Sequence, residues 1–123
     1  MTLSRFVLDT NIILYLLEDR LSQPLPSGIY FVSIITEMEL LSYPALSEVE
    51  TQKIRKFLSH LTVINLDEAI KTLAIQIRRQ YKLKLPDAII TATALSLDAI
   101  LLTNDRQLTK LPDLRIQSVD LSS

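Results

Sequence analysis

Short apolar runs alternate with longer amphipathic stretches along the chain. Runs rich in β-branched and other apolar residues predict strands, whereas apolar residues that recur every three or four positions predict helices. The predicted strands cover residues 5–8, 29–32, 62–64 and 99–102, with a candidate edge strand at 114–117. The predicted helices cover residues 12–17, 34–41, 47–58, 67–81, 87–97 and 105–110. This alternation predicts an α/β fold in which helices cover both faces of a mostly parallel sheet.

Capping residues mark several of the predicted helix ends. Residues 47–50 read Ser-Glu-Val-Glu, a capping-box pattern that favours a helix beginning there. Pro86 favours the first turn of the helix that follows it, where proline loses no backbone hydrogen bond. We expect the apolar side chains of the helix at 47–58 to form one buried stripe, made of Val49, Ile54, Phe57 and Leu58.

Length and composition suit one compact domain over residues 1–123. The chain is 48% hydrophobic, and its length leaves too little material for two independent cores. It has no cysteine, which excludes thiolate catalysis, thiolate zinc sites and disulfides, and fits a reducing compartment. No apolar run approaches the roughly 20 residues that a membrane span needs. We therefore expect a soluble, cytoplasmic protein.

Charge and histidine content narrow the possible chemistry. The net charge is −1, from 13 basic and 14 acidic residues, so any binding of nucleic acid must be local. His60 is the only histidine, and a Ser-His-Asp triad would have to use it. Because His60 directly follows a helical stretch, we expect it to have a role at the helix end instead.

Four acidic residues lie where the predicted topology brings separate segments to one edge of the sheet. Asp9 and Asp105 directly follow predicted strands, Asp87 lies in the first turn of its helix, and Glu39 lies inside the helix after the second strand. Right-handed crossovers return these segments to the same edge. Mg²⁺ prefers oxygen ligands and binds through a few carboxylates plus substrate phosphates. The four acids are therefore a candidate site for a hard divalent cation.

Each acid also has a purely structural interpretation. Asp9 and Asp105 could cap helices, and Asp87 could interact favourably with the dipole of its own helix. Glu39 could lie on an exposed helix face. Glu37 lies two positions before Glu39, so the two point to nearly opposite sides and only one can face the site. These patterns alone do not choose between the two glutamates.

Four ordered segments resemble the motifs of the PIN-domain family, with the VapC-type toxin ribonucleases as the nearest branch. The segments read FVLDTN (6–11), SIITEMEL (33–40), LPDAIITATA (85–94) and LTND (102–105), and the resemblance runs from about Arg5 to Ile116. It implies a three-layer α/β/α sandwich, an acid cluster that binds Mg²⁺ or Mn²⁺, and cleavage of single-stranded RNA. It also implies a small antitoxin partner of the VapB type.

The resemblance also implies roles for individual residues. The four acids Asp9, Glu39, Asp87 and Asp105 match the metal-binding and catalytic positions, and the motif selects Glu39 in preference to Glu37. Four polar residues match positions that flank the acids, and we interpret them as orienting carboxylates or binding water: Thr10, Asn11, Thr36 and Thr103. The expected reaction is hydrolysis by a metal-activated water, which leaves a 5′-phosphate and a 3′-hydroxyl.

A basic run leads into Asp87 and has two interpretations. Its members are Arg78, Arg79, Lys82 and Lys84. They are candidates for contacts to RNA phosphates, which add affinity but little sequence preference. They could equally form a solvated helix end, with cations placed against the helix dipole.

Two departures from the family pattern leave the choice of RNA open. No glycine follows Leu41, and Asn104 stands where a basic residue is common. One alternative function is a haloacid-dehalogenase-like phosphatase, but that class needs a second aspartate where this chain has Asn11. The other alternative is a catalytically silent PIN-like module that only binds a protein partner.

The high apolar content also predicts association. The mean hydropathy of +0.26 suggests more aliphatic side chains than one small core covers. We therefore expect a homodimer that also binds the antitoxin. The candidate contact surfaces are Ile54, Phe57 and Leu58, or the helix over residues 12–17.

Overall fold

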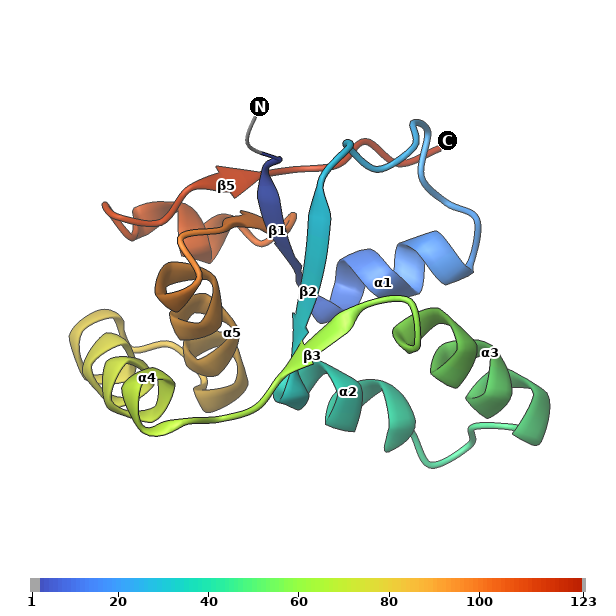
Figure 1. The fold of residues 1–123 in the computed structure, drawn as a ribbon, viewed down its shortest axis with the longest axis horizontal. Helices are drawn as coiled ribbons and strands as arrows, with labels where there is room; N and C mark the ends of the chain where they lie inside the picture. Colours follow the sequence, from blue (N-terminus) through green and yellow to red (C-terminus); the bar gives the residue numbers. More distant parts are fainter. Residues whose placement is uncertain (1–2, 123) are drawn as a thin grey trace.

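The computed structural model describes residues 3–122, in which five strands alternate with helices (Figure 1). The strands are β1 (Arg5–Leu8), β2 (Ile29–Ser33), β3 (Thr62–Ile64), β4 (Ile100–Leu102) and β5 (Ile116–Gln117). The α-helices are α1 (Thr10–Leu17), α2 (Ile34–Leu41), α3 (Glu48–Leu58), α4 (Glu68–Tyr81) and α5 (Leu85–Ser96), and a short 3₁₀ helix, η1, covers Arg106–Lys110. Every predicted element is present, with small differences at the ends.

The strands form one parallel sheet in the order β3-β2-β1-β4-β5. The chain first builds outward from β1 to β3, then returns to place β4 on the other side of β1. Leu8 at the end of β1 pairs with Leu102 at the end of β4. In open α/β sheets, ligands bind outside the carboxyl ends of the strands at such a reversal of strand order. The topology therefore singles out the edge where β1 and β4 end.

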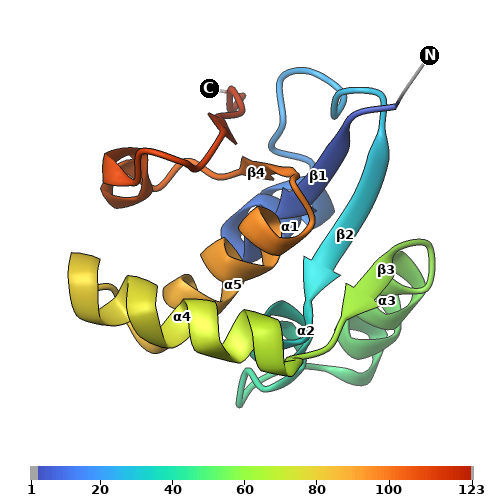
Figure 2. The ribbon, with the colours of Figure 1, turned by 60° about the vertical axis from the view of Figure 1, so that its left-hand side comes forward.

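Apolar side chains from alternate strand positions fill two cores, one on each face of the sheet. Val7 packs in the core that includes α4 and α5, whereas Phe6 and Leu8 pack in the core that includes α1 and α3. This alternation follows from the two-residue period of a strand. Figures 1 and 2 show α4 and α5 on one side of the sheet and α1 and α3 on the other. The expected three-layer α/β/α arrangement is confirmed.

Two sequence patterns mark the starts of α3 and α5. Ser47 and Glu50 form the predicted capping box of α3. Pro86 is the second residue of α5, which begins at Leu85, and residues 88–94 of this helix are all buried. Burial on every side positions α5 firmly, so that Asp87 in its first turn has a fixed location.

The buried stripe expected on α3 is only partly correct, and so is the expected contact surface. Val49 is 77% exposed and does not belong to the stripe. Ile54 and Leu58 are core residues, 5% and 6% exposed, so they do not form the exposed surface that was expected. In the helix over 12–17, Ile12 is also fully buried, and only residues 14–17 keep partial exposure.

Across residues 3–122, no helix has the length and apolar character needed to cross a membrane.

Candidate active site

Asp9 connects the ends of β1 and β4. It is the N-cap of α1, where its Oδ1 accepts a hydrogen bond from the backbone N–H of Thr10 at 2.8 Å. Its Oδ2 accepts a second hydrogen bond from Thr103 Oγ1 at 2.6 Å. The residue is only 8% exposed. Asp9 is therefore a helix cap, as one interpretation of the sequence held, but its second oxygen faces the end of another strand.

Thr103 links the side chain of Asp9 to the backbone of Asp105. Its hydroxyl donates to Asp9 and accepts from the backbone N–H of Asp105 at 3.0 Å. Asp105 in turn is the N-cap of η1 and accepts from the N–H of Gln107 at 3.0 Å. Because the Thr103 side chain is 1% exposed, little water competes for these bonds. The predicted role of Thr103 in orienting carboxylates matches these contacts.

A chain of two threonine hydroxyls reaches Glu39. Thr10 Oγ1 lies 2.7 Å from Glu39 Oε1 and 3.1 Å from Thr36 Oγ1. A threonine hydroxyl has one proton to donate. If Thr10 donates it to the glutamate, Thr10 accepts from Thr36, which is fully buried. Glu39, and not Glu37, thus lies beside the start of α1.

Electrostatic interactions connect Asp87 to the other three acids. Burial raises the pKa of Asp87, and the negative charges of Asp9, Asp105 and Glu39 raise it further, against a smaller opposing effect of Lys84. Burial also raises the pKa of Asp9, against the hydrogen bonds from Thr103 and Thr10, while Asp105 and Glu39 add to the rise. The four acids are therefore close enough to repel one another, and no ion pair within residues 3–122 involves any of them.

The chemistry of this donor set fits a hard divalent cation. All four side chains offer oxygen ligands, and their negative charge lacks an ion-pair partner in the described part of the chain. In their present positions, however, no three of the acids within residues 3–122 lie close enough to surround one ion. Mg²⁺ usually keeps several of its waters and contacts only one or two carboxylates. The spacing therefore suits a partly hydrated ion better than a closed protein cage.

Thr91 was not among the residues predicted for the site. Its hydroxyl oxygen is fully buried and has no hydrogen-bond partner in residues 3–122. An unsatisfied buried polar group costs about 1–3 kcal/mol. Thr91 lies four residues after Asp87 on α5, and residues four apart share one face of a helix. This spacing of four residues is the sequence signal that could have placed Thr91 on the same helix face as Asp87.

The remaining predicted residues are more exposed. Asn11 is exposed, and its side chain forms no hydrogen bond with the described residues. His60 lies just beyond α3, with Nδ1 2.8 Å from the carbonyl oxygen of Lys56, in agreement with the expected role at a helix end.

The basic run surrounds the connection between α4 and α5. All four of its side chains are exposed: Arg78 and Arg79 in the last turn of α4, Lys82 as its C-cap and Lys84 as the N-cap of α5. Of these, Lys84 affects the pKa of Asp87. Exposure is compatible with both interpretations of the run.

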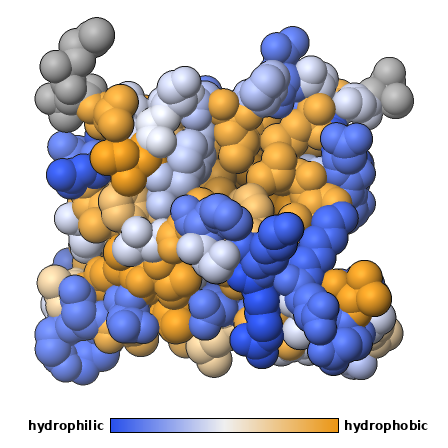
Figure 3. Space-filling view, turned by 45° about the vertical axis from the view of Figure 1, so that its right-hand side comes forward, coloured by the Kyte–Doolittle hydropathy of each residue, from blue (hydrophilic) through white to orange (hydrophobic). Residues whose placement is uncertain are grey.

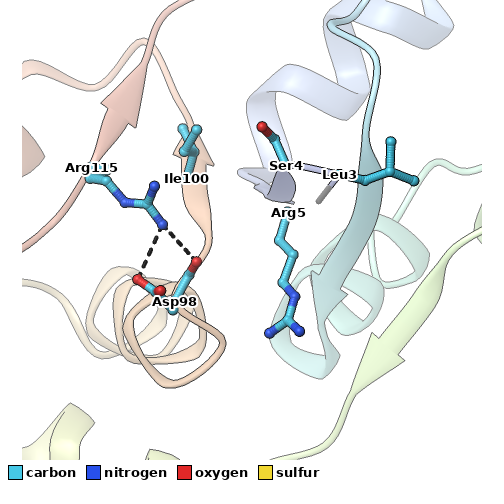
Figure 4. A pocket seen from close by; sticks show the side chains of 6 residues that line it. All are labelled: Leu3, Ser4, Arg5, Asp98, Ile100 and Arg115. Atoms are coloured by element: carbon cyan, nitrogen blue, oxygen red, sulfur yellow. Dashed lines mark hydrogen bonds and ion pairs between the residues drawn. The ribbon is translucent and has the colours of Figure 1, made fainter. Parts of the chain in front are cut away.

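Two pockets lie at opposite edges of the sheet. One, of about 530 Å³, is bordered by Thr103 and Asp105 and so adjoins the acids. The other, of about 360 Å³, lies near the amino ends of β1 and β4 (Figure 4). There Arg115 binds the carbonyl oxygen and Oδ1 of Asp98, and Arg5 donates to the carbonyl oxygen of Leu97. None of the candidate acids lines this second pocket.

Comparison with protein families and solved structures gives a consistent result. The family model described as PIN domain matches residues 6–114. A chain in a toxin–antitoxin complex from Klebsiella pneumoniae is 33% identical, with a TM-score of 0.74 over 88% of this chain and 93% of that one. VapBC-1 from nontypeable Haemophilus influenzae is 28% identical, with a TM-score of 0.75 over 93% of this chain and 97% of that one.

A more distant likeness supports the fold alone. VapBC2 from Rickettsia felis, solved with a DNA fragment from its promoter, is 21% identical, with a TM-score of 0.79 over 94% of this chain and 99% of that one. Among curated proteins, no significant match was found.

Proposed function

Because the chain belongs to the PIN domain family, we propose that it is a metal-dependent endoribonuclease that hydrolyses RNA phosphodiester bonds. The observation that carries the proposal is the set of acids at the reversal of strand order. The four acids come from four different segments. The charges of Asp105 and Glu39 raise the pKa values of both Asp9 and Asp87. A catalytically silent module would have no need to keep these repelling charges together.

We assign the four acids to hold Mg²⁺ or Mn²⁺. The ion would stabilise negative charge on the phosphate and lower the pKa of a water molecule. Asp9 is held at both oxygens, by Thr10 and by Thr103, so its carboxylate keeps a fixed direction. Asp87 makes no side-chain hydrogen bond to the described residues, which leaves its oxygens available. Either Asp9 or Asp105 orients the attacking water, and the ribose 2′-hydroxyl takes no part.

We further propose that the protein is the toxin of a type II toxin–antitoxin pair and forms a homodimer. The support for a VapB-like antitoxin is the likeness to the Klebsiella pneumoniae complex and to VapBC-1. A groove of about 210 Å³ between α1 and α3 suits an apolar segment of such a partner, because Leu14, Leu17 and Leu46 line it. Figure 3 shows apolar surface between hydrophilic groups on the side of the molecule that carries these helices. Sedimentation that finds a monomer at high micromolar concentration would contradict the dimer.

The metal dependence is tested with the purified chain and a 5′-labelled single-stranded RNA. We expect cleavage in Mg²⁺ or Mn²⁺, none in excess chelator, and products that carry a 5′-phosphate. Asp87→Asn should abolish cleavage. Asp113→Asn is the matched control, since Asp113 is an exposed aspartate that does not act on the pKa values of Asp9 and Asp87. Undiminished cleavage in chelator would refute the metal dependence, and no cleavage under any condition would favour the silent module.

A further inference from the structure

The pocket beside Asp105 opens outside the carboxyl ends of β4 and β5. Thr103 and Asp105 border it on the side of the acids, and Ile116 and Val119 border it on the side of β5. Its volume of about 530 Å³ lies within the range of small-molecule sites. A chain of nucleotides lying across the acids would therefore meet this pocket next.

Hydrogen bonds already made within the protein decide which lining groups can bind a ligand. The hydroxyl of Thr103 is committed to Asp9 and to the backbone of Asp105. Asn104 is committed as well, because its Nδ2 donates to the carbonyl oxygen of Val119 at 3.1 Å and its Oδ1 accepts from the N–H of Val119 at 2.9 Å. This pair of bonds holds the segment after β5 against the loop after β4. Asn104 therefore shapes the pocket wall and is held in place by Val119.

The carboxylate of Asp105 borders the pocket, and two of its other polar side chains have no partner within residues 3–122. The Arg106 guanidinium forms no ion pair or hydrogen bond within residues 3–122, and the same holds for the Ser118 hydroxyl. Ile116 and Val119 are partly buried and supply an apolar wall. The pocket thus combines one free cation, one free hydroxyl and an aliphatic surface, which together match a phosphate linked to a sugar and a base.

We propose that this pocket binds the nucleotide that adjoins the scissile phosphate of single-stranded RNA. Arg106 binds a backbone phosphate, Ser118 hydrogen-bonds to the ribose or base, and the base packs against Ile116 and Val119. The proposal rests on the ribonuclease function proposed above. Bases in single strands are free of pairing and can turn out into such a pocket.

Charge gives an independent reason for this assignment. The acids repel an RNA phosphate wherever a metal ion does not neutralise them, so the strand needs cations on the flanks of the site. Lys84 supplies one beside Asp87. Arg106, directly after Asp105, supplies another at the pocket. An RNA strand held at both places would lie across the acids.

The test compares Arg106→Ala with Arg55→Ala, which removes the same charge from an exposed position on α3. Figure 1 shows α3 beside β3, at the opposite end of the strand order from β5. We expect Arg106→Ala to raise KM for a short single-stranded RNA about tenfold with little change in kcat, since a charge-assisted hydrogen bond contributes about that factor. It should also make RNA binding less dependent on salt, by about 0.7 in the logarithmic slope. Arg55→Ala should match the wild type.

A second variant fills the pocket and leaves its charge unchanged. Ser118→Trp should raise KM as well and should change the base preferred next to the cut, as read by sequencing the products of a randomised RNA. Thermal melts confirm that each variant folds. Wild-type KM and base preference in both folded variants would overturn the proposal.

Fluorescence anisotropy with the same RNA separates this proposal from the ribonuclease function. A wild type that binds RNA without cutting it would refute only the ribonuclease, and the loss of affinity in Arg106→Ala would still support the pocket. A wild type that neither binds nor cuts RNA would overturn both.

Discussion

Replacing Asp87 by asparagine distinguishes a metal site from a set of helix caps, because the two interpretations predict stability changes of opposite sign. The change removes one negative charge at nearly constant shape. In the folded protein that charge is disfavoured by burial and by Asp9, Asp105 and Glu39. If Asp87 only interacted with the dipole of α5, its loss would lower stability by about 0.3–1 kcal/mol.

The expected gain follows from the repulsion that the substitution relieves. Two unit charges roughly 8 Å apart interact by about 2 kcal/mol at an effective dielectric of 20 and by about 0.5 kcal/mol in water. Because Asp87 is only half-buried, solvent screening favours the lower value for each of the three acids. After the loss of the dipole interaction, a net gain of about 0.5–1 kcal/mol remains without metal. For a domain of this size, that corresponds to a rise in Tm of about 2–4 °C.

Magnesium should reverse the order of stability. At a hundredfold excess over its dissociation constant, the ion stabilises the wild type by about 2.7 kcal/mol and the variant by much less. Thermal melts with and without Mg²⁺, together with one RNA cleavage assay, measure both effects. Asp113→Asn serves as the control and should keep the magnesium response of the wild type. An Asp87→Asn protein that is destabilised yet still cleaves RNA would remove Asp87 from the site.

Three further predictions concern the acids and their surroundings. Burial, helped by the neighbouring acids, raises the pKa values of Asp9 and Asp87 above 3.8, so the folded state holds more protons than the unfolded state between pH 3.8 and the raised values. Without metal, the free energy of unfolding should therefore fall as pH rises through this window, which denaturant titrations at several pH values measure. A flat pH profile would contradict the raised pKa values. Thr103→Val should cost about 1–3 kcal/mol of stability and most of the activity, whereas Thr103→Ser should restore both; an active valine variant would rule out the positioning role. Replacing Arg78, Arg79 and Lys82 by alanine should weaken binding of all RNA sequences alike and flatten the salt dependence of binding. An unchanged salt slope would assign these residues to the solvated surface.

The order of the elements and the placement of the acids could be predicted from the sequence, because both depend on local patterns. Apolar periodicity distinguishes strands from helices, and residues 47–50 form the capping box that their spacing predicts. Asp9 and Asp105 directly follow strands, so a parallel sheet brings them to one edge whatever the details of packing. The sequence alone therefore determined the fold class and the edge at which the acids meet.

Contacts between distant segments were decided only by the tertiary structure. The bond from Thr103 to Asp9 joins residues 94 positions apart, and the bond from Thr10 to Glu39 joins residues 29 positions apart. Helical spacing predicted a buried stripe that included Val49, but the neighbouring helices cover only Ile54 and Leu58 closely. Local propensity sets which face of a helix is apolar, whereas the packing of other elements sets how far burial extends along that face. The pocket beside Asp105 has the same origin, since its wall depends on the contact between Asn104 and Val119, which lies in the segment after β5.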